Sequence, residues 1–258
     1  MIPKIIHYCW FSGEPFPPEV ESCLASWRAF LPDFHFRLWD MAAIRDLKSD
    51  FLKEALDVRK WAFASDYVRL YAIHMFGGVY LDTDVLLHRS FETLLQHSAF
   101  IGKESSIHFE GRLSSQYLTS HCFGAEKGHP FIKDCLDYYE GRHFLYSNNE
   151  RLPLSLRTAQ ALLPYIQSEI ARIYGYNDSP SSQEIQLCKD GLVIYPSLYF
   201  DPTKVTNDSF CRHLALGAWR ERRSAEPVYN LRYKIEWRVF ALLERILQRY
   251  HYILRKID

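Results

Sequence analysis

Three short runs of apolar residues in the first 90 positions have the pattern of buried β-strands. The first run is rich in β-branched and aromatic residues. In the second, Phe34, Phe36 and Leu38 alternate with polar residues. The third is interrupted in its middle by an Asp-Thr-Asp sequence. The pattern therefore predicts strands over residues 4–11, 35–40 and 79–87.

Between these runs, apolar residues recur every three or four positions, which is the spacing of one face of an α-helix. The clearest case has Trp61, Ala64, Val68, Ala72 and Met75 on one face. The two glycines at 77 and 78 predict the end of that helix, because glycine adopts the backbone conformation of a helix C-terminus without strain. The spacing predicts helices over residues 20–30, 41–58 and 61–76.

Later parts of the chain are less regular. Residues 112–180 predict mainly helices joined by loops, 192–200 predict a late strand, and 232–257 predict a long amphipathic helix. The strand-helix alternation of the first 90 residues is typical of an α/β sheet with a nucleotide-binding edge. We therefore expect one α/β domain over residues 1–228 and a separate basic helix over 229–258.

Composition narrows the class of protein. The 258 residues include 31 basic and 31 acidic side chains, and the resulting zero net charge argues against a nucleic-acid-binding protein. Six widely spaced cysteines without a CxxC pair argue against a zinc ribbon and indicate reduced thiols. Because neither a signal peptide nor an apolar run of about 18 residues is recognisable, we expect a cytoplasmic location.

Two carboxylates, Asp82 and Asp84, carry the strongest chemical signal. Residues two apart on a strand face the same side, so the two charges repel each other unless a cation lies between them. A divalent cation would relieve that repulsion and could bridge to a diphosphate, and oxygen ligands favour Mn²⁺ or Mg²⁺ over zinc. An acidic turn without a ligand is the plainer alternative. The surrounding sequence, GGVYLDTDV, favours the metal site.

A second polar pair precedes it on the predicted helix over 61–76. Asp66 and Arg69 are three residues apart and are therefore neighbours on the helix surface. They could form an ordinary surface ion pair, which contributes little to stability. Alternatively they contact ribose or sugar hydroxyls of a ligand, since the arginine fork suits oxygen-rich molecules.

Three blocks together resemble the sugar-binding DxD glycosyltransferases of family 32. They are IPKIIHYCW from residue 2, ASDYVR from residue 64 and GGVYLDTDV from residue 77, and they occur in the order typical of that family. Weaker matches follow at 124–131 and between His213 and Trp219. The family includes bacterial capsular-polysaccharide transferases and the yeast initiation-specific mannosyltransferase, and it is more distantly similar to the clostridial glucosylating toxins.

This resemblance implies a GT-A fold with a mixed central sheet and a helical C-terminal region, a Mn²⁺-type ion, and transfer of a hexose with retention of configuration. The donor would be a UDP- or GDP-hexose, and the acceptor a saccharide or a lipid-linked saccharide in capsule, exopolysaccharide or lipopolysaccharide synthesis. Trp10 would stack on the donor base, Asp66 and Arg69 would hold ribose and sugar hydroxyls, and Asp82 would contact the ribose or sugar. The implied metal ligands are Asp82, Asp84 and His213, and Trp219 would close over the diphosphate.

The chain also departs from the family pattern. Ala218 stands where family members often have Ser before the C-terminal Trp, and Ser120 and His121 occupy the region where many relatives carry Asn. Trp10 and His213 could instead be a core aromatic and a partly buried histidine. We expect His129 to be structural, and we assign no residue as the catalytic acid, base or nucleophile.

Two other classes of function remain as alternatives. A haloacid-dehalogenase-like phosphatase also has an apolar strand that ends in DxDx(T/V), which Leu81 to Val85 satisfy. However, that motif normally opens the domain, and no downstream GDxxxD partner is evident. The third class is a module that retains the fold and binds sugar or membrane without catalysis.

The last 28 residues differ in charge from the rest of the chain. Residues 231–258 carry seven basic and three acidic side chains, with apolar residues at helical spacing. A basic amphipathic helix of this kind either packs on the domain with a solvated basic face or lies on an anionic membrane surface. Peripheral contact with the inner face of the cytoplasmic membrane through 231–257 is therefore one of two expectations.

Overall fold

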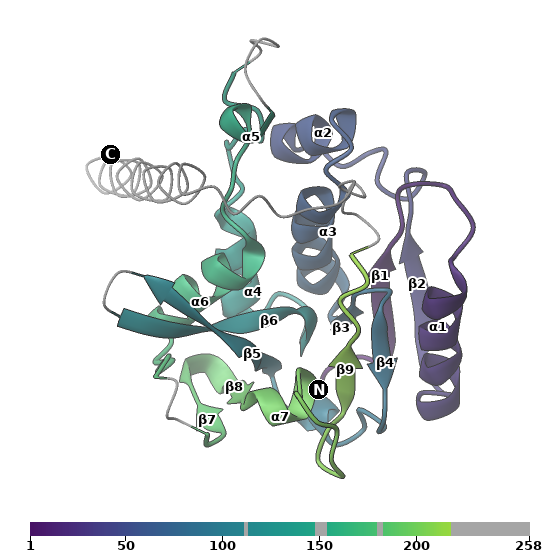
Figure 1. The fold of residues 1–258 in the computed structure, drawn as a ribbon, viewed down its shortest axis with the longest axis vertical. Helices are drawn as coiled ribbons and strands as arrows, with labels where there is room; N and C mark the ends of the chain where they lie inside the picture. Colours follow the sequence, from purple (N-terminus) through teal and green to yellow (C-terminus); the bar gives the residue numbers. More distant parts are fainter. Residues whose placement is uncertain (111–112, 148–153, 180–182, 218–258) are drawn as a thin grey trace, which may run out of the picture. The chain divides into compact units, whose positions relative to one another are not determined.

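The structure is a computed structural model that describes residues 1–110, 113–147, 154–179 and 183–217 (Figure 1). Tertiary contacts divide the chain into two compact units, Met1–Trp219 and Arg220–Asp258. The second unit lies outside the described residues, together with the predicted helix over 232–257 and the predicted domain boundary at residue 228. All elements named below belong to the first unit.

A seven-stranded mixed sheet forms the centre of this unit. Its strands are β1 (Ile5–Cys9), β2 (His35–Trp39), β3 (Gly78–Leu81), β5 (Ala99–Glu110), β6 (Leu113–Ala125), β7 (Gln186–Leu187) and β8 (Leu192–Tyr195). They lie in the order β2-β1-β3-β6-β5-β8-β7. The strand β1 is parallel to both of its neighbours, β6 is antiparallel to β3 and β5, and β8 is parallel to β5 but antiparallel to β7. The predicted α/β class with a mixed central sheet is confirmed.

A small second sheet lies beside the large one. It pairs β4 (Val85–Leu87) with β9 (Cys211–His213) in antiparallel register (Figure 1). Only residues 82–84 separate β3 from β4, and a hydrogen bond from the Val85 amide to the Asp82 carbonyl, 3.0 Å long, closes a turn there. The chain therefore passes from one sheet to the other within three residues, and the Asp-Thr-Asp sequence forms that passage.

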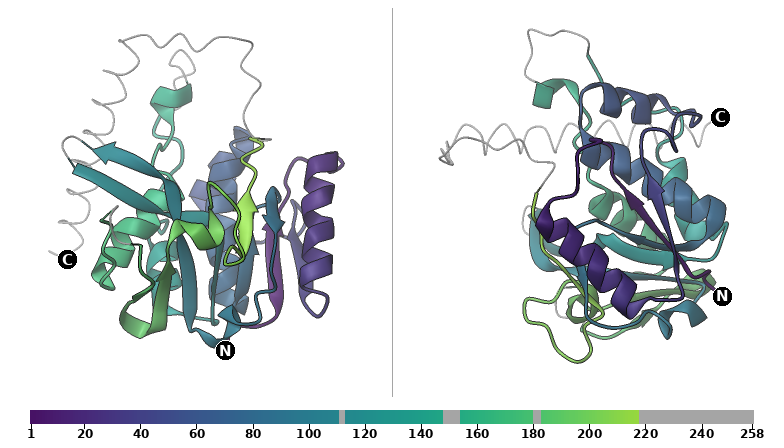
Figure 2. Two further views of the ribbon diagram at one scale, coloured as in Figure 1. Left: turned by 60° about the horizontal axis from the view of Figure 1, so that its bottom comes forward. Right: turned by 90° about the vertical axis from the view of Figure 1, so that its right-hand side faces the viewer.

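Helices cover both faces of the large sheet (Figure 1 and Figure 2). One face carries α3, α4 and α6, whereas α1 and α7 belong to the other face, with the small sheet. Short 3₁₀ turns occupy Leu94–Gln96 and Lys189–Gly191. The α-helices are α1 (Pro18–Phe30), α2 (Asp50–Asp57), α3 (Trp61–Phe76), α4 (Pro130–Asp137), α5 (Leu154–Arg157), α6 (Leu163–Ile173) and α7 (Ser197–Phe200).

Two hydrophobic cores follow from the two-residue period of the strands. In β3, Val79 and Leu81 pack into a core with Trp27 of α1, whereas Tyr80 faces the core beneath α3. Residues of β5 and β8 alternate between the same two cores. Because both faces of these central strands are buried, their sequences read as nearly continuous apolar runs.

Most predictions for the first 90 residues are confirmed, including the helix over 61–76 and the interrupted third strand. The helix expected over 41–58 begins only at Asp50. Its N-terminus is set by Ser49, whose Oγ accepts a hydrogen bond from the Leu52 amide at 3.2 Å. The preceding residues form turns, one of them closed by the Ala43 amide and Asp40 Oδ1 at 2.8 Å.

The prediction of helices at the start of 112–180 is wrong. Residues 113–125 form β6, which pairs with β5 on one side and β3 on the other. No local sequence pattern identifies residues 113–125 as a strand. Their conformation depends on pairing with strands elsewhere in the chain. Helices α4, α5 and α6 do follow it. The late strand predicted over 192–200 ends at Tyr195, since Pro196 precedes the first turn of α7.

Among the described residues, no helix combines the length and the apolar character needed to cross a lipid bilayer.

We predict that Gly78→Ala is more destabilising than Gly175→Ala. Both glycines have positive φ, +109° and +102°, where an alanine costs about 1–2 kcal/mol in backbone strain. At Gly78 the added Cβ would also lie 2.6 Å from the Ile5 carbonyl oxygen, whereas at Gly175 it would meet nothing within 4 Å. We expect Gly78→Ala to lower the free energy of unfolding by more than about 3 kcal/mol in urea denaturation. Equal losses in the two variants would contradict this account.

Candidate functional site

Side chains from two distant parts of the chain meet beside the turn between the sheets. One ligand atom from each of Asp82, Asp84 and His213 lies within 4.8 Å of the other two. The small sheet causes this meeting, because its register pairs Val85 with His213 and so places the histidine next to Asp84. The three residues predicted as metal ligands therefore come together in the structure.

The carboxylate of Asp84 is held on both of its oxygens. Its Oδ1 lies 3.1 Å from Nε2 of His213, and its Oδ2 accepts a hydrogen bond from the Leu216 amide at 3.0 Å. Burial raises the pKa of Asp84, but the hydrogen bond and charge of His213 outweigh that effect and hold the pKa below its ordinary value. Conversely, burial lowers the pKa of His213, while Asp84 raises it, with a net rise above 6.5. The pair therefore favours a carboxylate beside an imidazolium.

A buried arginine holds Asp82 from the other side. The guanidinium of Arg69, on α3, lies 3.2 Å from Asp82 Oδ1 and 3.3 Å from Asp66 Oδ1, and the side chain is only 4% exposed. Its remaining bonds go to the Ser65 carbonyl and hydroxyl and to the Ser120 carbonyl, at 3.1, 2.6 and 2.7 Å. The interpretation of Asp66 and Arg69 as a surface ion pair is therefore wrong, because both side chains are buried.

Asp66 has an unusual ionisation for a carboxylate. Burial raises its pKa to about 7, against the opposing effects of the Arg69 charge and of a hydrogen bond from the Leu163 amide. Asp66 can therefore exchange a proton near neutral pH, whereas an ordinary aspartate is fully ionised there. Its predicted contact with donor hydroxyls stays a prediction, and this pKa would let it either donate or accept such a hydrogen bond.

Trp10 follows β1 directly, at the carboxyl edge of the large sheet. Its amide donates to the Trp39 carbonyl at 3.0 Å, its indole N–H donates to the Glu14 carbonyl at 2.7 Å, and its ring lies 5.0 Å from that of Phe16. The residue is partly exposed and belongs to neither buried core. Because β1 and β3 are parallel neighbours, Trp10 and Asp82 follow strands that end at the same edge. Trp219, by contrast, lies outside the described residues.

Two residues of the site were not predicted. The hydroxyl of Tyr80 donates to Asp82 Oδ1 at 2.9 Å, and the ring of His121 stacks on that of His213 with centroids 4.5 Å apart. Tyr80 had a usable signal, since a residue two positions before Asp82 on a strand shares its face. For His121 the sequence offered no such signal, because β6 itself was not predicted. The residue was noted only as a departure from the family pattern.

The donor set of Asp82, Asp84 and His213 fits a divalent cation. Two carboxylate oxygens suit Mg²⁺, Ca²⁺ and Mn²⁺, whereas imidazole is a ligand for transition metals, so the combination favours Mn²⁺ over Mg²⁺. The three side chains are neither fully buried nor fully exposed. A cation held by three protein atoms would need further oxygen ligands, which water or a diphosphate can supply.

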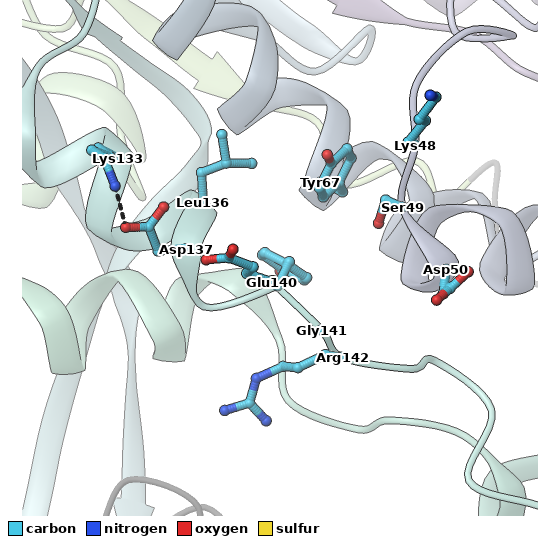
Figure 3. A pocket seen from close by; sticks show the side chains of 11 residues that line it. Lys48, Ser49, Asp50, Tyr67, Lys133, Leu136, Asp137, Glu140, Gly141 and Arg142 are labelled. Carbon is cyan, nitrogen blue, oxygen red and sulfur yellow. Dashed lines mark hydrogen bonds and ion pairs between the residues drawn. The ribbon is translucent and has the colours of Figure 1, made fainter. Parts of the chain in front are cut away.

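A separate cavity of about 430 Å³ lies between α2, α3 and the end of α4 (Figure 3). Both acidic and basic side chains line the cavity, and Lys133 contacts Asp137 on one of its walls. Tyr67, next to Asp66 in sequence, forms part of its lining, but the cavity contains none of the predicted site residues.

Curated relatives align with parts of this chain. It is 28% identical over 135 residues to inositol phosphoceramide mannosyltransferase 3 of Schizosaccharomyces pombe, which covers 51% of this chain and 35% of that protein. It is 29% identical over 159 residues to the uncharacterized glycosyltransferase L373 of Acanthamoeba polyphaga mimivirus, covering 58% of each. The chain thus spans about a third to somewhat over half of the length of these relatives.

Solved structures with similar folds are more distant. The PaToxG glycosyltransferase matches with a TM-score of 0.44 and 17% identity, over 67% of this chain and 69% of that one. The galactosyltransferase LgtC, solved with donor and acceptor sugar analogues, matches with a TM-score of 0.40 and 13% identity, over 76% of this chain and 74% of that one.

The family model described as "Capsular polysaccharide synthesis protein" matches residues 1–169, which include Trp10, Asp66, Arg69, Asp82 and Asp84. Because this match covers well over half of the chain, the protein belongs to the capsular polysaccharide synthesis protein family.

Proposed function

We propose that this protein is a metal-dependent glycosyltransferase of the GT-A type. It would move a hexose from a nucleoside-diphosphate sugar to a saccharide or lipid-linked acceptor. The observation that carries the proposal is the meeting of Asp82, Asp84 and His213 at the edge of the large sheet. Membership of the capsular polysaccharide synthesis family and the glycosyltransferase names of the aligned relatives support the same class of reaction.

The leaving group of such a reaction is a nucleoside diphosphate. Asp82, Asp84 and His213 would hold Mn²⁺ or Mg²⁺, and the bound cation would supply charge stabilisation of the departing diphosphate. Arg69 keeps Asp82 in place through the ion pair at 3.2 Å. Asp66 and Arg69 would lie against the ribose and sugar, Trp10 would stack on the base, and Trp219 would close over the diphosphate.

We further propose that the transfer retains the anomeric configuration. In such a transfer the acceptor hydroxyl attacks the face of the sugar that the diphosphate leaves, so the enzyme supplies no covalent nucleophile. Accordingly no catalytic base or nucleophile is assigned. The donor would be a UDP- or GDP-hexose, and the product would belong to a capsular polysaccharide, exopolysaccharide or lipopolysaccharide. Peripheral membrane contact through 231–257 belongs to the same proposal, because it would bring the enzyme to a lipid-linked acceptor.

The direct test incubates the protein with Mn²⁺ and a panel of UDP- and GDP-hexoses and measures release of the nucleoside diphosphate. A glycosyltransferase slowly hydrolyses its own donor, and that donor should also raise the melting temperature in the presence of Mn²⁺. A phosphatase would release phosphate from p-nitrophenyl phosphate instead. A binding module would raise the melting temperature with a sugar ligand and release neither product.

The first prediction concerns the metal ligand Asp84. We expect Asp84→Ala to abolish Mn²⁺-dependent binding of nucleoside diphosphate, measured by isothermal titration calorimetry, while circular dichroism shows an intact fold. Asp46→Ala is the matched control, because that aspartate is 89% exposed and remote from the site in sequence. Unchanged nucleotide affinity in the Asp84 variant would contradict the proposed metal site.

The second prediction is a pH dependence of metal binding. His213 must lose its proton before its nitrogen can ligate a cation, and its pKa is raised above 6.5 by Asp84. Mn²⁺ affinity should therefore increase with pH, by up to about tenfold per pH unit, until the pH exceeds the raised pKa. Calorimetric titrations between pH 5.5 and 8.5 would measure it. In His213→Gln the slope should be smaller, because the titrating group at position 213 is gone and Asp66, with a pKa of about 7, is the group near the site that still titrates. An equal slope in both proteins would refute the assignment.

The third prediction concerns base stacking by Trp10. Stacking of a base on an aromatic ring is worth about 1–3 kcal/mol, so Trp10→Ala should weaken nucleoside diphosphate binding roughly ten- to a hundredfold. Trp10→Phe retains a ring and should lose much less. Nucleotide should quench tryptophan fluorescence in the wild type and clearly less in Trp10→Phe, in which Trp219 is still present. If affinity and quenching are the same in all three proteins, Trp10 does not contact the base.

A further inference from the structure

Behind the metal-ligand histidine lies a second, fully enclosed one. The ring of His121 is nearly parallel to that of His213, with an interplanar angle of 20° and centroids 4.5 Å apart. His121 is 4% exposed, whereas the side chain of His213 is 28% exposed. One face of the His213 ring is therefore covered by a flat, buried ring, while its Nε2 points to Asp84.

The main chain of His121 is part of the site. Its carbonyl accepts a hydrogen bond from the Asp82 amide at 2.9 Å, which continues the β3–β6 pairing by one residue beyond Leu81. The carbonyl of the preceding residue, Ser120, accepts a hydrogen bond from the Arg69 guanidinium at 2.7 Å. Residues 120 and 121 of β6 therefore contact the Asp82 main chain, the Arg69 guanidinium and the His213 ring.

The ring of His121 is itself fixed from behind. Its Nε2 lies 3.1 Å from the Phe200 carbonyl, at the end of α7, and because a carbonyl can only accept, this nitrogen carries the proton. The following residue, Asp201, accepts hydrogen bonds from the Ser105 amide and hydroxyl of β5 at 2.7 and 2.9 Å. The end of α7 is thus tied to the large sheet, and the His121 ring has a rigid support.

We propose that His121 is a positioning residue that holds the His213 imidazole in the orientation needed for metal binding. The inference rests on the proposed function, since it takes His213 as a metal ligand. The stacked ring restricts rotation of His213 about its side-chain bonds, so its Nε2 stays directed toward the carboxylates. A pre-arranged donor atom loses less conformational freedom when a cation binds, and the cation therefore binds more tightly.

This role explains the identity of residue 121 better than core filling does. An apolar side chain would fill the space without leaving a buried N–H to satisfy, yet the chain places an imidazole there and supplies it with the Phe200 carbonyl. The bond fixes the rotation of the ring about its own axis, and that rotation decides whether it lies flat against His213.

The test compares three variants of the full-length protein. His121→Ala removes the stacked ring and the hydrogen bond, and His121→Phe keeps a flat ring but cannot donate to Phe200. His129→Ala is the matched control, because His129 is also buried, at 5% exposed, and its Nε2 also bonds a backbone carbonyl, that of Asp190 at 2.9 Å. His129 is the N-cap residue of α4 and accepts a hydrogen bond from the Phe131 amide, so we expect its replacement to lower stability without affecting the stack.

Three readouts separate positioning from stability. They are Mn²⁺ affinity by calorimetry without any nucleotide, the free energy of unfolding in urea, and the ring ¹⁵N and ¹H shifts of His213 in the metal-free protein. We expect His121→Ala to weaken Mn²⁺ binding about 10- to 100-fold, the usual range for groups that orient a metal ligand. The His213 resonances should shift and broaden in that variant, and His121→Phe should lie between it and the wild type. In His129→Ala the unfolding free energy should fall while Mn²⁺ affinity and the His213 resonances stay as in the wild type.

Wild-type Mn²⁺ affinity and unchanged His213 resonances in His121→Ala would overturn the inference and leave the proposed function intact. If the wild type binds no Mn²⁺, the metal role of His213 fails, and with it both the proposed function and the inference. If His121→Ala does not fold, His121→Phe decides the question by the same readouts, because its ring retains the volume of the core. An equal loss of affinity in His129→Ala would assign the effect to stability and also overturn the inference.

Discussion

The buried guanidinium of Arg69 joins the segments on which this site is built. It pairs with Asp66 on its own helix and with Asp82 on the turn between the sheets, and it donates to the Ser120 carbonyl of β6. Removing one partner of a buried ion pair typically costs about 3–5 kcal/mol, because the other charge is left without compensation. Here two carboxylates share one cation, and the pKa of Asp66, raised by burial to about 7, relieves part of the excess negative charge. On the other side of the turn, the imidazolium of His213 compensates the charge of Asp84.

The position of the site follows from a change of sheet. The chain leaves β3, turns within three residues and enters β4, whose partner β9 ends at His213. The Asp-Thr-Asp sequence was expected to lie on a strand, but it forms this turn, and the two carboxylates nevertheless remain close enough to share one ion. The large sheet anchors Asp82 and the small sheet anchors Asp84 and His213, so the site depends on both.

Sequence patterns predicted the parts of the fold in which local signals agree. The helix over 61–76 has a consistent apolar face and two glycines at its end, and the structure has the same bounds. The segment over 41–58 is only half helical, because Ser49 caps the helix and the helix therefore begins at Asp50. Residues 113–125 lie in the segment predicted as mainly helices joined by loops, and they form a strand whose polar and apolar residues follow no clean period. Its pairing with β3 and β5, far away in the chain, decides its conformation.

The sequence by itself determined the chemistry of the site: two carboxylates two positions apart, and an Asp and an Arg three apart on one helix face. Those relations are local, and the geometry of one turn or one helix enforces them. Only the tertiary structure decided that Arg69 is buried and bound to Asp82, that His213 lies beside Asp84, and that His121 stacks behind it. The residues of the Asp84–His213 contact are 129 positions apart, and they meet because β9 pairs with β4. Strand pairing between distant segments is set by packing of the whole sheet, so no local pattern encodes it.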